Sequence, residues 1–138
     1  MNPHHRVELD RPLHTPHDGD LGTFGEDLAD EHLRDADALH VLARNWRLRA
    51  GELRGELDLI ALDESAGALV VVEVKTRRDA ARYGGALHAV SYRKAAKVRT
   101  LTAAFLREAG MAVGQVRLDV VAIDLGRRPV LHHLLGAL

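Results

Sequence analysis

The chain has 138 residues, which suits a single domain with one hydrophobic core. Hydrophobic residues make up 46% of it and charged residues 28%, and no apolar run approaches bilayer length, so we expect a globular protein with no membrane partner. The absence of cysteine excludes disulfides and thiolate metal sites, and together with a polar start unlike a secretory signal it fits a cytoplasmic protein.

The charges are unevenly distributed, although the net charge of -1 by itself points to no partner. Between Lys75 and Arg99, eight basic residues accompany one acid, Asp79, which gives this segment a net charge of +7. A near-neutral protein with one strongly basic segment has a surface suited to a polyanion. A solvated charged surface that binds nothing is the ordinary alternative.

The N-terminal part divides into a tail and a helix. Residues 1–20 contain three prolines and four histidines with little apolar periodicity, so we expect a disordered tail before a single domain over 21–138. Apolar residues at helical spacing predict a helix over about 23–37. Thr23 suits its N-cap, and Glu26, three residues later, would complete a capping box.

Strand signals dominate the rest of the chain. A further helix is predicted over about 92–109, with Ser91 as its cap and Gly110 as its stop. This helix is long enough to serve as a crossover that makes the strands on either side of it parallel. The prediction is an α/β fold with a mixed sheet of four to five strands and helices on both faces. The predicted strands cover 39–49, 56–63, 68–77, 116–125 and 130–135, and the short joins among the first three favour an antiparallel meander.

Two carboxylates and a lysine fall on neighbouring strands of this meander. Side chains alternate along a strand, so Glu73 and Lys75 share one face, and a hairpin partner would bring Asp58 beside Glu73. Repulsion between adjacent carboxylates is relieved by a divalent cation, and Mg²⁺ commonly takes one or two protein carboxylates. Lys75 would then orient or deprotonate a water, or stabilise charge on a phosphate. A plain ion pair of Lys75 with either acid is the structural alternative.

The basic residues of the second helix favour the metal-site interpretation. Arg93, Lys94, Lys97 and Arg99 lie in its N-terminal half, where the helix dipole disfavours cations. A bound phosphate would make the same positions favourable. Basic side chains beside a two-carboxylate metal site indicate phosphodiester chemistry.

Five blocks of the sequence occur in a recognisable order: GxxGExxAxxxL from Gly22, NWR from Asn45, GELDLIA from Gly55, VEVKTR from Val72 and RLDV from Arg117. In this order they resemble the YraN-like family of small bacterial proteins, within the restriction-endonuclease-like (PD-(D/E)XK nuclease) superfamily. The resemblance runs from about Gly22 to the C-terminus and is far more specific than a Glu-x-Lys pattern alone. It implies the αβββαβ nuclease core.

The resemblance also implies site roles. Asp58 and Glu73 would hold Mg²⁺ or Mn²⁺, Lys75 would be the catalytic lysine, and Glu26 would be the helical glutamate that assists with metal or water. That role for Glu26 competes with the capping box. The nucleic-acid backbone, more readily DNA than RNA, would be contacted by Arg77, Arg78, Lys94 and Lys97.

The expected function is therefore that of a metal-dependent nuclease acting on DNA phosphodiester bonds, with structured or branched DNA of recombination and repair as candidate substrates. The alternative is a non-catalytic nucleic-acid-binding accessory module with the same fold. A homodimer would suit a branched substrate, because a junction presents two strands to cut, but no sequence feature marks an interface.

Three further polar positions stay open at this stage. Asp119 extends the acidic site or pairs with Arg117, and the ion pair is favoured. Glu56 shares a face with Asp58 and could support it. Strand alternation places His132 and His133 on opposite faces, which argues against a joint metal site.

Overall fold

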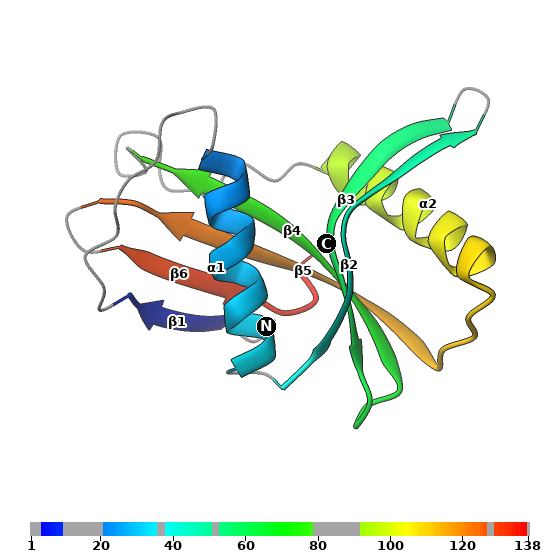
Figure 1. Cartoon of the computed structure of the whole chain (residues 1–138), viewed down its shortest axis with the longest axis horizontal. Coiled ribbons are helices and arrows are strands. Elements are labelled where there is room, and N and C mark those ends of the chain that lie inside the picture. The colour runs from blue at the N-terminus through cyan, green and yellow to red at the C-terminus, as the bar shows by residue number, and fades with distance from the viewer. Residues whose placement is uncertain are drawn as a thin grey trace.

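A computed structural model of the chain describes residues 4–9, 21–35, 38–50, 53–78, 92–126 and 129–137. Within these residues it contains two helices and a six-stranded sheet (Figure 1). In chain order the elements are β1 (His4–Glu8), α1 (Leu21–Asp35), β2 (His40–Ala50), β3 (Leu53–Asp63), β4 (Ala68–Arg77), α2 (Tyr92–Ala109), β5 (Gln115–Asp124) and β6 (Val130–Leu134).

The strand order in the sheet is β1-β6-β5-β4-β3-β2. The hairpins β2–β3 and β3–β4 are antiparallel, which confirms the predicted meander. Strands β4 and β5, on either side of α2 in the chain, pair in parallel, which confirms the predicted crossover. The result is a mixed α/β sheet compatible with the restriction-endonuclease-like core.

Strand β1 corrects two predictions, the four-to-five-strand sheet and the disordered tail. Residues His4–Glu8 pair antiparallel with β6 and make a sixth strand. All five of them are exposed, and their sequence, HHRVE, has no alternation of apolar and polar residues from which a strand could be predicted. The pairing satisfies backbone groups of β6 that would otherwise form an open sheet edge. The other residues of the predicted tail, except Leu9, lie outside the described residues.

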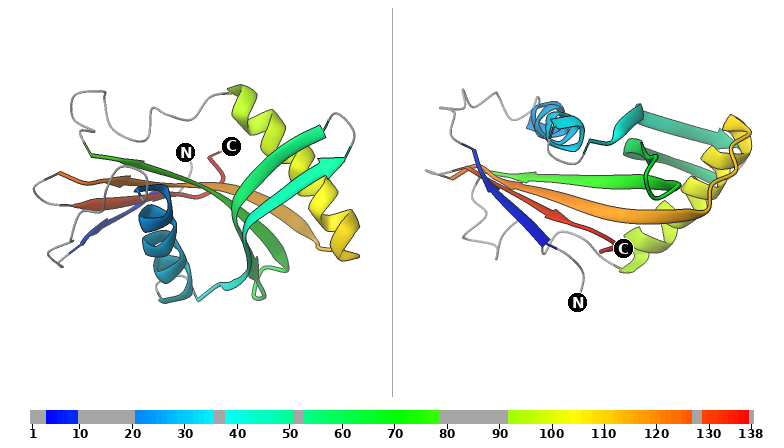
Figure 2. Two further views of the ribbon diagram at one scale, coloured as in Figure 1. Left: turned by 45° about the horizontal axis from the view of Figure 1, so that its top comes forward. Right: turned by 90° about the horizontal axis from the view of Figure 1, so that it is seen from below.

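The two helices cover opposite faces of the sheet (Figure 2). On the α1 face, Leu33 packs with Val70 and Val72 of β4. On the α2 face, Leu101 packs with Val71 and other apolar residues. Even-numbered valines of β4 thus pack against α1 and the odd-numbered Val71 against α2, because side chains alternate along a strand. Neither helix of the described chain has the length and apolar composition needed to cross a membrane.

The C-terminal half of β2 and the N-terminal half of β3 pair with each other but not with β4, and so form an arm that projects from the main sheet. Pairing between β3 and β4 ends at Leu59↔Val72, whereas β2 and β3 stay paired outward to Ala50↔Leu53. We call residues 45–50 and 53–58 the β2–β3 arm, which curves alongside α2 in Figure 1. Trp46 meets Phe105 of α2 edge-on, with ring centroids 5.5 Å apart. One face of the arm is therefore packed against α2.

The helix ends differ partly from prediction. Helix α1 already begins at Leu21, so Thr23 lies inside the helix and the predicted capping box is wrong. Glu26 is therefore not engaged at a helix start. At the end of α2, Gly110 adopts a φ of 63°, and the Met111 N–H donates to the Leu106 carbonyl at 3.1 Å. This glycine stop was predicted correctly, whereas Ser91 lies outside the described residues.

Candidate active site

Asp58 and Glu73 meet where the β2–β3 arm separates from β4. They are the next residues after the last cross-strand pair, Leu59↔Val72, in the register of the hairpin. The Asp58 Oδ2 atom accepts a hydrogen bond of 2.9 Å from the Val74 N–H. A side chain of β3 thus bonds the β4 backbone at the point where the strand ladder stops. The predicted neighbourhood of the two carboxylates is confirmed.

The two carboxylates disturb each other electrostatically. Glu73 is buried, with 4% of its side chain exposed. Burial, followed by the charge of Glu73, raises the pKa of Asp58 to about 7, while the Val74 N–H and Lys94 oppose the rise. A carboxyl group whose pKa lies near 7 is partly protonated at neutral pH. A divalent cation would replace that proton and stabilise both carboxylates in their charged form.

Two lysines contact Glu73. Its Oε1 atom lies 3.5 Å from the Lys75 Nζ on β4 and 2.9 Å from the Lys94 Nζ on α2. The hydrogen bond to Glu73 raises the pKa of Lys94 despite partial burial. The predicted position of Lys75 next to the acids is confirmed, and so is the ion pair that was its alternative. The contact between Lys94 and Glu73 was not predicted, because it joins residues of different elements.

Glu26 approaches the site from α1. The helix lies so close to β4 that a Cβ on Gly25 would come 1.8 Å from the Thr76 Oγ1 atom, so only glycine fits there. Burial raises the pKa of Glu26, with Arg44 opposing and Glu56 adding to the rise. Its Oε2 atom is buried and has no hydrogen-bond partner in the described part of the chain. Such an orphaned oxygen is costly to bury and is a ready ligand for a cation.

The donors at this point suit a hard cation. Asp58, Glu73 and Glu26 supply carboxylate oxygens, the ligand type that Mg²⁺ and Mn²⁺ prefer. Among the described residues, no three His, Asp or Glu side chains are already arranged to hold a metal. Mg²⁺ usually takes one or two protein carboxylates and completes its shell with water and phosphate oxygens, so the Asp58–Glu73 pair fits it.

The predicted nucleic-acid contacts cluster around the same elements. Arg77 is exposed at the end of β4, and Arg78 follows it. Lys94 and Lys97 lie one turn apart on α2, and Lys97 is exposed. A Cβ on Gly55 would lie 3.1 Å from the Lys97 Cε, so this lysine reaches the β2–β3 arm. The remaining basic loop lies outside the described residues.

A group of arginines on the β2–β3 arm was not predicted from the sequence. A groove of about 390 Å³ lies over the arm, and we call it the arm groove. These arginines could have been predicted to share one face of a strand, because Arg47 and Arg49 alternate with Trp46 and Leu48 along the sequence. The arm groove is lined by Arg47, Leu48, Arg49, Arg54, Gly55 and Glu56.

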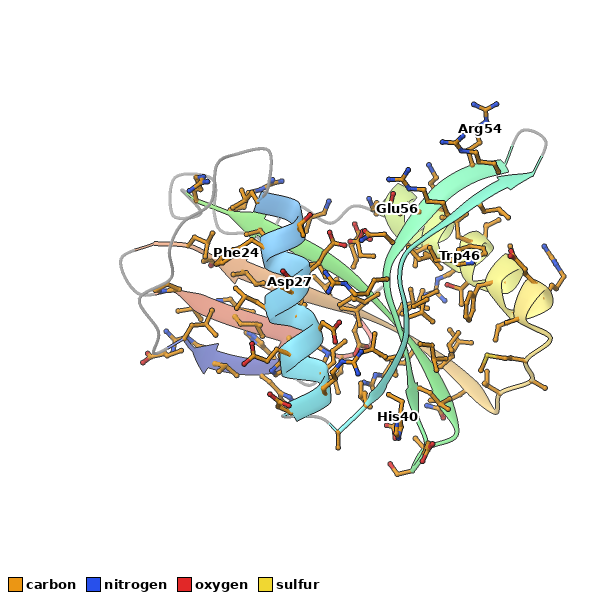
Figure 3. All side chains as sticks on the ribbon, in the orientation of Figure 1. Phe24, Asp27, His40, Trp46, Arg54 and Glu56 are labelled. Carbon is orange, nitrogen blue, oxygen red and sulfur yellow. The ribbon has the colours of Figure 1, made fainter. Side chains whose placement is uncertain are left out.

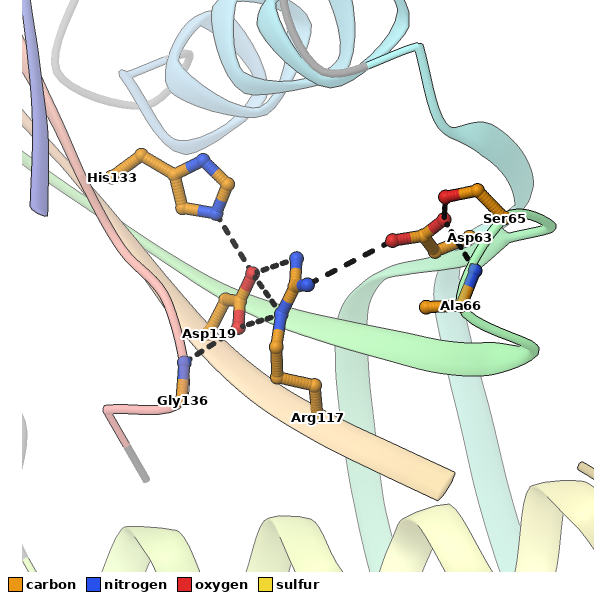
Figure 4. A network of polar contacts seen from close by, with 7 residues as sticks. All are labelled: Asp63, Ser65, Ala66, Arg117, Asp119, His133 and Gly136. Carbon is orange, nitrogen blue, oxygen red and sulfur yellow. Dashed lines mark hydrogen bonds and ion pairs between the residues drawn. The ribbon is translucent and has the colours of Figure 1, made fainter. Parts of the chain in front are cut away.

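Asp119 lies in a separate polar network (Figure 4). Arg117 Nε donates to its Oδ1 at 2.9 Å, which confirms the favoured ion pair. His133 Nε2 lies 2.8 Å from its Oδ2, and the Gly136 N–H donates to Oδ1 at 2.9 Å. Burial raises the pKa of Asp119, but the hydrogen bonds from His133 and Arg117 outweigh burial and leave this pKa below its usual value. Asp119 is therefore a satisfied structural carboxylate.

The other two open positions also find partners away from a metal site. His132 lies on the other face of β6 from His133, with its Nε2 3.7 Å from Asp124 Oδ2, so the predicted separation of the two rings is confirmed. Glu56 accepts a hydrogen bond of 2.9 Å from Arg47 Nε. It affects the acidic site through its charge, which raises the pKa of Glu26.

The fold and this site together define a class of protein. The elements from α1 to β5 follow the αβββαβ order, and neighbouring carboxylates and a lysine lie at the point where the antiparallel strands β3 and β4 diverge. This fold is compatible with a restriction-endonuclease-like core.

The chain belongs to a family described as "Uncharacterised protein family UPF0102", whose model matches residues 25–123. This is the YraN family that the sequence blocks resemble. A UPF0102 protein of Mycobacterium sp. (strain JLS) is 42% identical over 118 residues, covering 84% of this chain and 83% of the relative. A UPF0102 protein of Mycolicibacterium smegmatis is 42% identical over 119 residues, covering 85% and 91%. One of Mycobacterium ulcerans (strain Agy99) is 42% identical over 118 residues, covering 84% and 92%.

Proposed function

We propose that the chain is a metal-dependent nuclease that acts on DNA phosphodiester bonds. The observation that carries the proposal is the position of Asp58 at the strand divergence, where it accepts the Val74 N–H and the charge of nearby Glu73 raises its pKa, with Lys75 Nζ 3.5 Å from the Glu73 carboxylate. An acid whose pKa is raised by burial and by a neighbouring acid, next to an ammonium group, is typical of a site that binds a cation and handles a proton.

Each residue has a role in this proposal. Asp58 and Glu73 would hold Mg²⁺ or Mn²⁺, and Glu26 would bind the ion or a water through its unpartnered oxygen. When bound, the ion would polarise the phosphate and lower the pKa of a bound water. Lys75 would orient the attacking water from its place beside Glu73.

Basic residues around the acids would hold the substrate. Lys94 is already placed by its ion pair with Glu73, and Lys97 lies one turn further along the same helix face. With Arg77 and Arg78 they would contact phosphates on either side of the cut bond. Structured or branched DNA of recombination and repair is the substrate class that we propose to test first.

A second function is supported by the ion pairs of Glu73. Two ammonium groups contact Glu73 and compensate its charge, so the chain itself supplies partners for this carboxylate. A non-catalytic nucleic-acid-binding module would need no more than this. Binding of DNA without cleavage under any metal would favour that function.

The test is cleavage of labelled duplex, flap and four-way-junction DNA with Mg²⁺ or Mn²⁺. We expect Asp58→Ala to abolish cleavage and Lys75→Ala to slow it by ~10²-fold or more, as expected on loss of a proton-handling side chain. Arg107→Ala is the matched control, because Arg107 is an exposed basic residue near the far end of α2. Equal activity in all four proteins would indicate a contaminating nuclease and overturn the proposal.

A second readout does not depend on activity. Crystals soaked in Mn²⁺ should show anomalous density between Asp58 and Glu73, and Asp58→Asn should remove it. Density at another position, or none at millimolar Mn²⁺ and pH 8, would rule out the metal site.

A further inference from the structure

The arm groove is a basic surface of the described chain, and its arginines differ from the four basic residues assigned to the acidic site. Arg47, Arg49 and Arg54 line it together with one acid, Glu56. All three arginines are exposed. Figure 3 shows Arg54 at the outer part of the β2–β3 arm and Glu56 closer to α1.

The cross-strand pairs of the arm leave positive charge uncompensated. Arg47 pairs with Glu56, and their side chains form an ion pair of 2.9 Å. The next pair on the same face, two residues outward, is Arg49↔Arg54. Like charges directly opposite each other destabilise a strand pair, and no described residue forms an ion pair with either arginine. A bound anion would remove this repulsion.

The arm groove leads to the acidic site. Arg54, Glu56 and Asp58 are alternate residues of β3 and follow one another along the strand. Four residues of extended strand separate Arg54 from Asp58 by ~13 Å. Backbone phosphates of one DNA strand advance by ~3.4 Å per nucleotide along the helix axis, so this distance corresponds to ~4 nucleotides.

The chemistry of the arm groove selects a phosphate backbone rather than bases. Guanidinium groups bind phosphate through paired N–H donors. The aromatic residue of the arm, Trp46, is turned towards Phe105 on α2 and does not line the groove, so base stacking, the usual support of single-strand binding, is absent from it.

We propose that the arm groove binds the sugar-phosphate backbone of duplex DNA through Arg49 and Arg54, about four nucleotides from the phosphate held at Asp58 and Glu73. This inference rests on the proposed function for the position of the cut bond. It adds a duplex-binding surface to the four basic residues already assigned.

The test measures binding, not cleavage. Fluorescence anisotropy of a labelled 30-base-pair duplex is recorded against salt concentration, with Asp58→Ala present in every protein to prevent cutting. Each lost phosphate contact should lower the slope of log affinity against log salt by ~0.9, so Arg49→Ala plus Arg54→Ala should lower it by ~1.8. Arg107→Ala, an exposed arginine outside the arm groove, should leave the slope unchanged. Thermal melting of each variant verifies that it is folded.

The outcomes separate this inference from the nuclease proposal. An unchanged slope in the folded double variant, or an equal loss with Arg107→Ala, would overturn the arm inference whatever the cleavage assay shows. A lowered slope, together with no cleavage by the protein that retains Asp58, would support the arm inference and contradict the nuclease proposal. Equal loss of affinity for a single strand of the same length would overturn the duplex preference. Binding to polyglutamate but not to DNA would overturn both proposals.

Discussion

Asp58 and Asp119 are two carboxylates of one sheet, on β3 and β5, and their pKa values are shifted in opposite directions. Asp119 is fully buried and receives hydrogen bonds from Arg117, His133 and the Gly136 N–H, so its pKa is lowered. Asp58 receives one backbone hydrogen bond, lies next to Glu73, and has a pKa raised to about 7. The first site is complete within the chain, whereas the second is the site at which we propose that a cation binds.

This difference distinguishes a buried carboxylate that stabilises the fold from one that is typical of a functional site. Donors that match a buried carboxylate stabilise its charge and hold elements together, and Asp119 in this way ties β5 to β6 and to the segment after it. Carboxylates that face each other destabilise the folded chain until a ligand arrives, which is a common property of functional sites. Removal of the two carboxylates should therefore change stability in opposite directions.

The largest expected effect is on the Asp119 network. Asp119→Ala leaves Arg117 and His133 without their buried partner, and we expect the free energy of unfolding to fall by ~3–5 kcal/mol, the usual range for breaking a buried ion pair. Denaturant unfolding measures it. Asp27→Ala is the control, because Asp27 pairs with Arg44 at 2.6 Å on the surface and should cost no more than ~1 kcal/mol. Equal decreases in the free energy of unfolding for the two variants would mean that the buried Asp119 network stabilises the fold no more than a surface ion pair does.

Asp58→Asn should act in the opposite direction. The amide oxygen still accepts the Val74 N–H, and the repulsion with Glu73 disappears. At pH 8 without metal we expect a gain of ~1–2 kcal/mol, below the ~4 kcal/mol that a shift of ~3 pKa units would give in full at ~1.4 kcal/mol per unit. Denaturant unfolding in a chelating agent measures it. A loss of stability would mean that Asp58 is a structural carboxylate like Asp119.

The pH dependence should distinguish the two sites without mutation. The pKa of Asp58 is raised on folding, so the folded protein binds the extra proton and the metal-free stability falls as pH rises from about 4 to about 7. The pKa of Asp119 is lowered, so its contribution is present above its unfolded pKa and is lost at lower pH. Because the proposed metal would replace the proton, the rise in Tm caused by Mn²⁺ should be larger at pH 8 than at pH 6. The Asp58→Asn variant should show no such difference.

The smallest effect on stability is expected for Glu26→Gln. The substitution keeps the shape of the side chain and removes the charge of a group whose pKa is already raised, so the free energy of unfolding should change by less than ~0.5 kcal/mol. The affinity for Mn²⁺, measured by calorimetry, should fall by ~10–100-fold if Glu26 supports the metal. Unchanged affinity would exclude Glu26 from the site and leave Asp58 and Glu73 as the ligands.

The carboxylate pair itself was predictable from the sequence. The alternation of β4 and the short turn before it fix the hairpin register, and that register places Asp58 beside Glu73. The roles of Glu26 and Lys94 were less accessible. The sequence also allowed a capping-box role for Glu26, which the helix start at Leu21 rules out. Lys94 was predicted to contact phosphate, and its ion pair with Glu73 could not be predicted because the two residues lie on different elements.

The sequence by itself determined the order of the elements, the antiparallel meander, the parallel crossover and the neighbourhood of the two acids, because each depends on periodicity and short connections. Only the tertiary structure decided the sixth strand, in which His4 lies beside His132 at a separation of 128 residues. It also decided how the β2–β3 arm packs on α2 and which cations meet Glu73. These contacts join surfaces that are distant in the chain, and the free energy that selects them comes from packing and charge pairing and leaves no local pattern in the sequence.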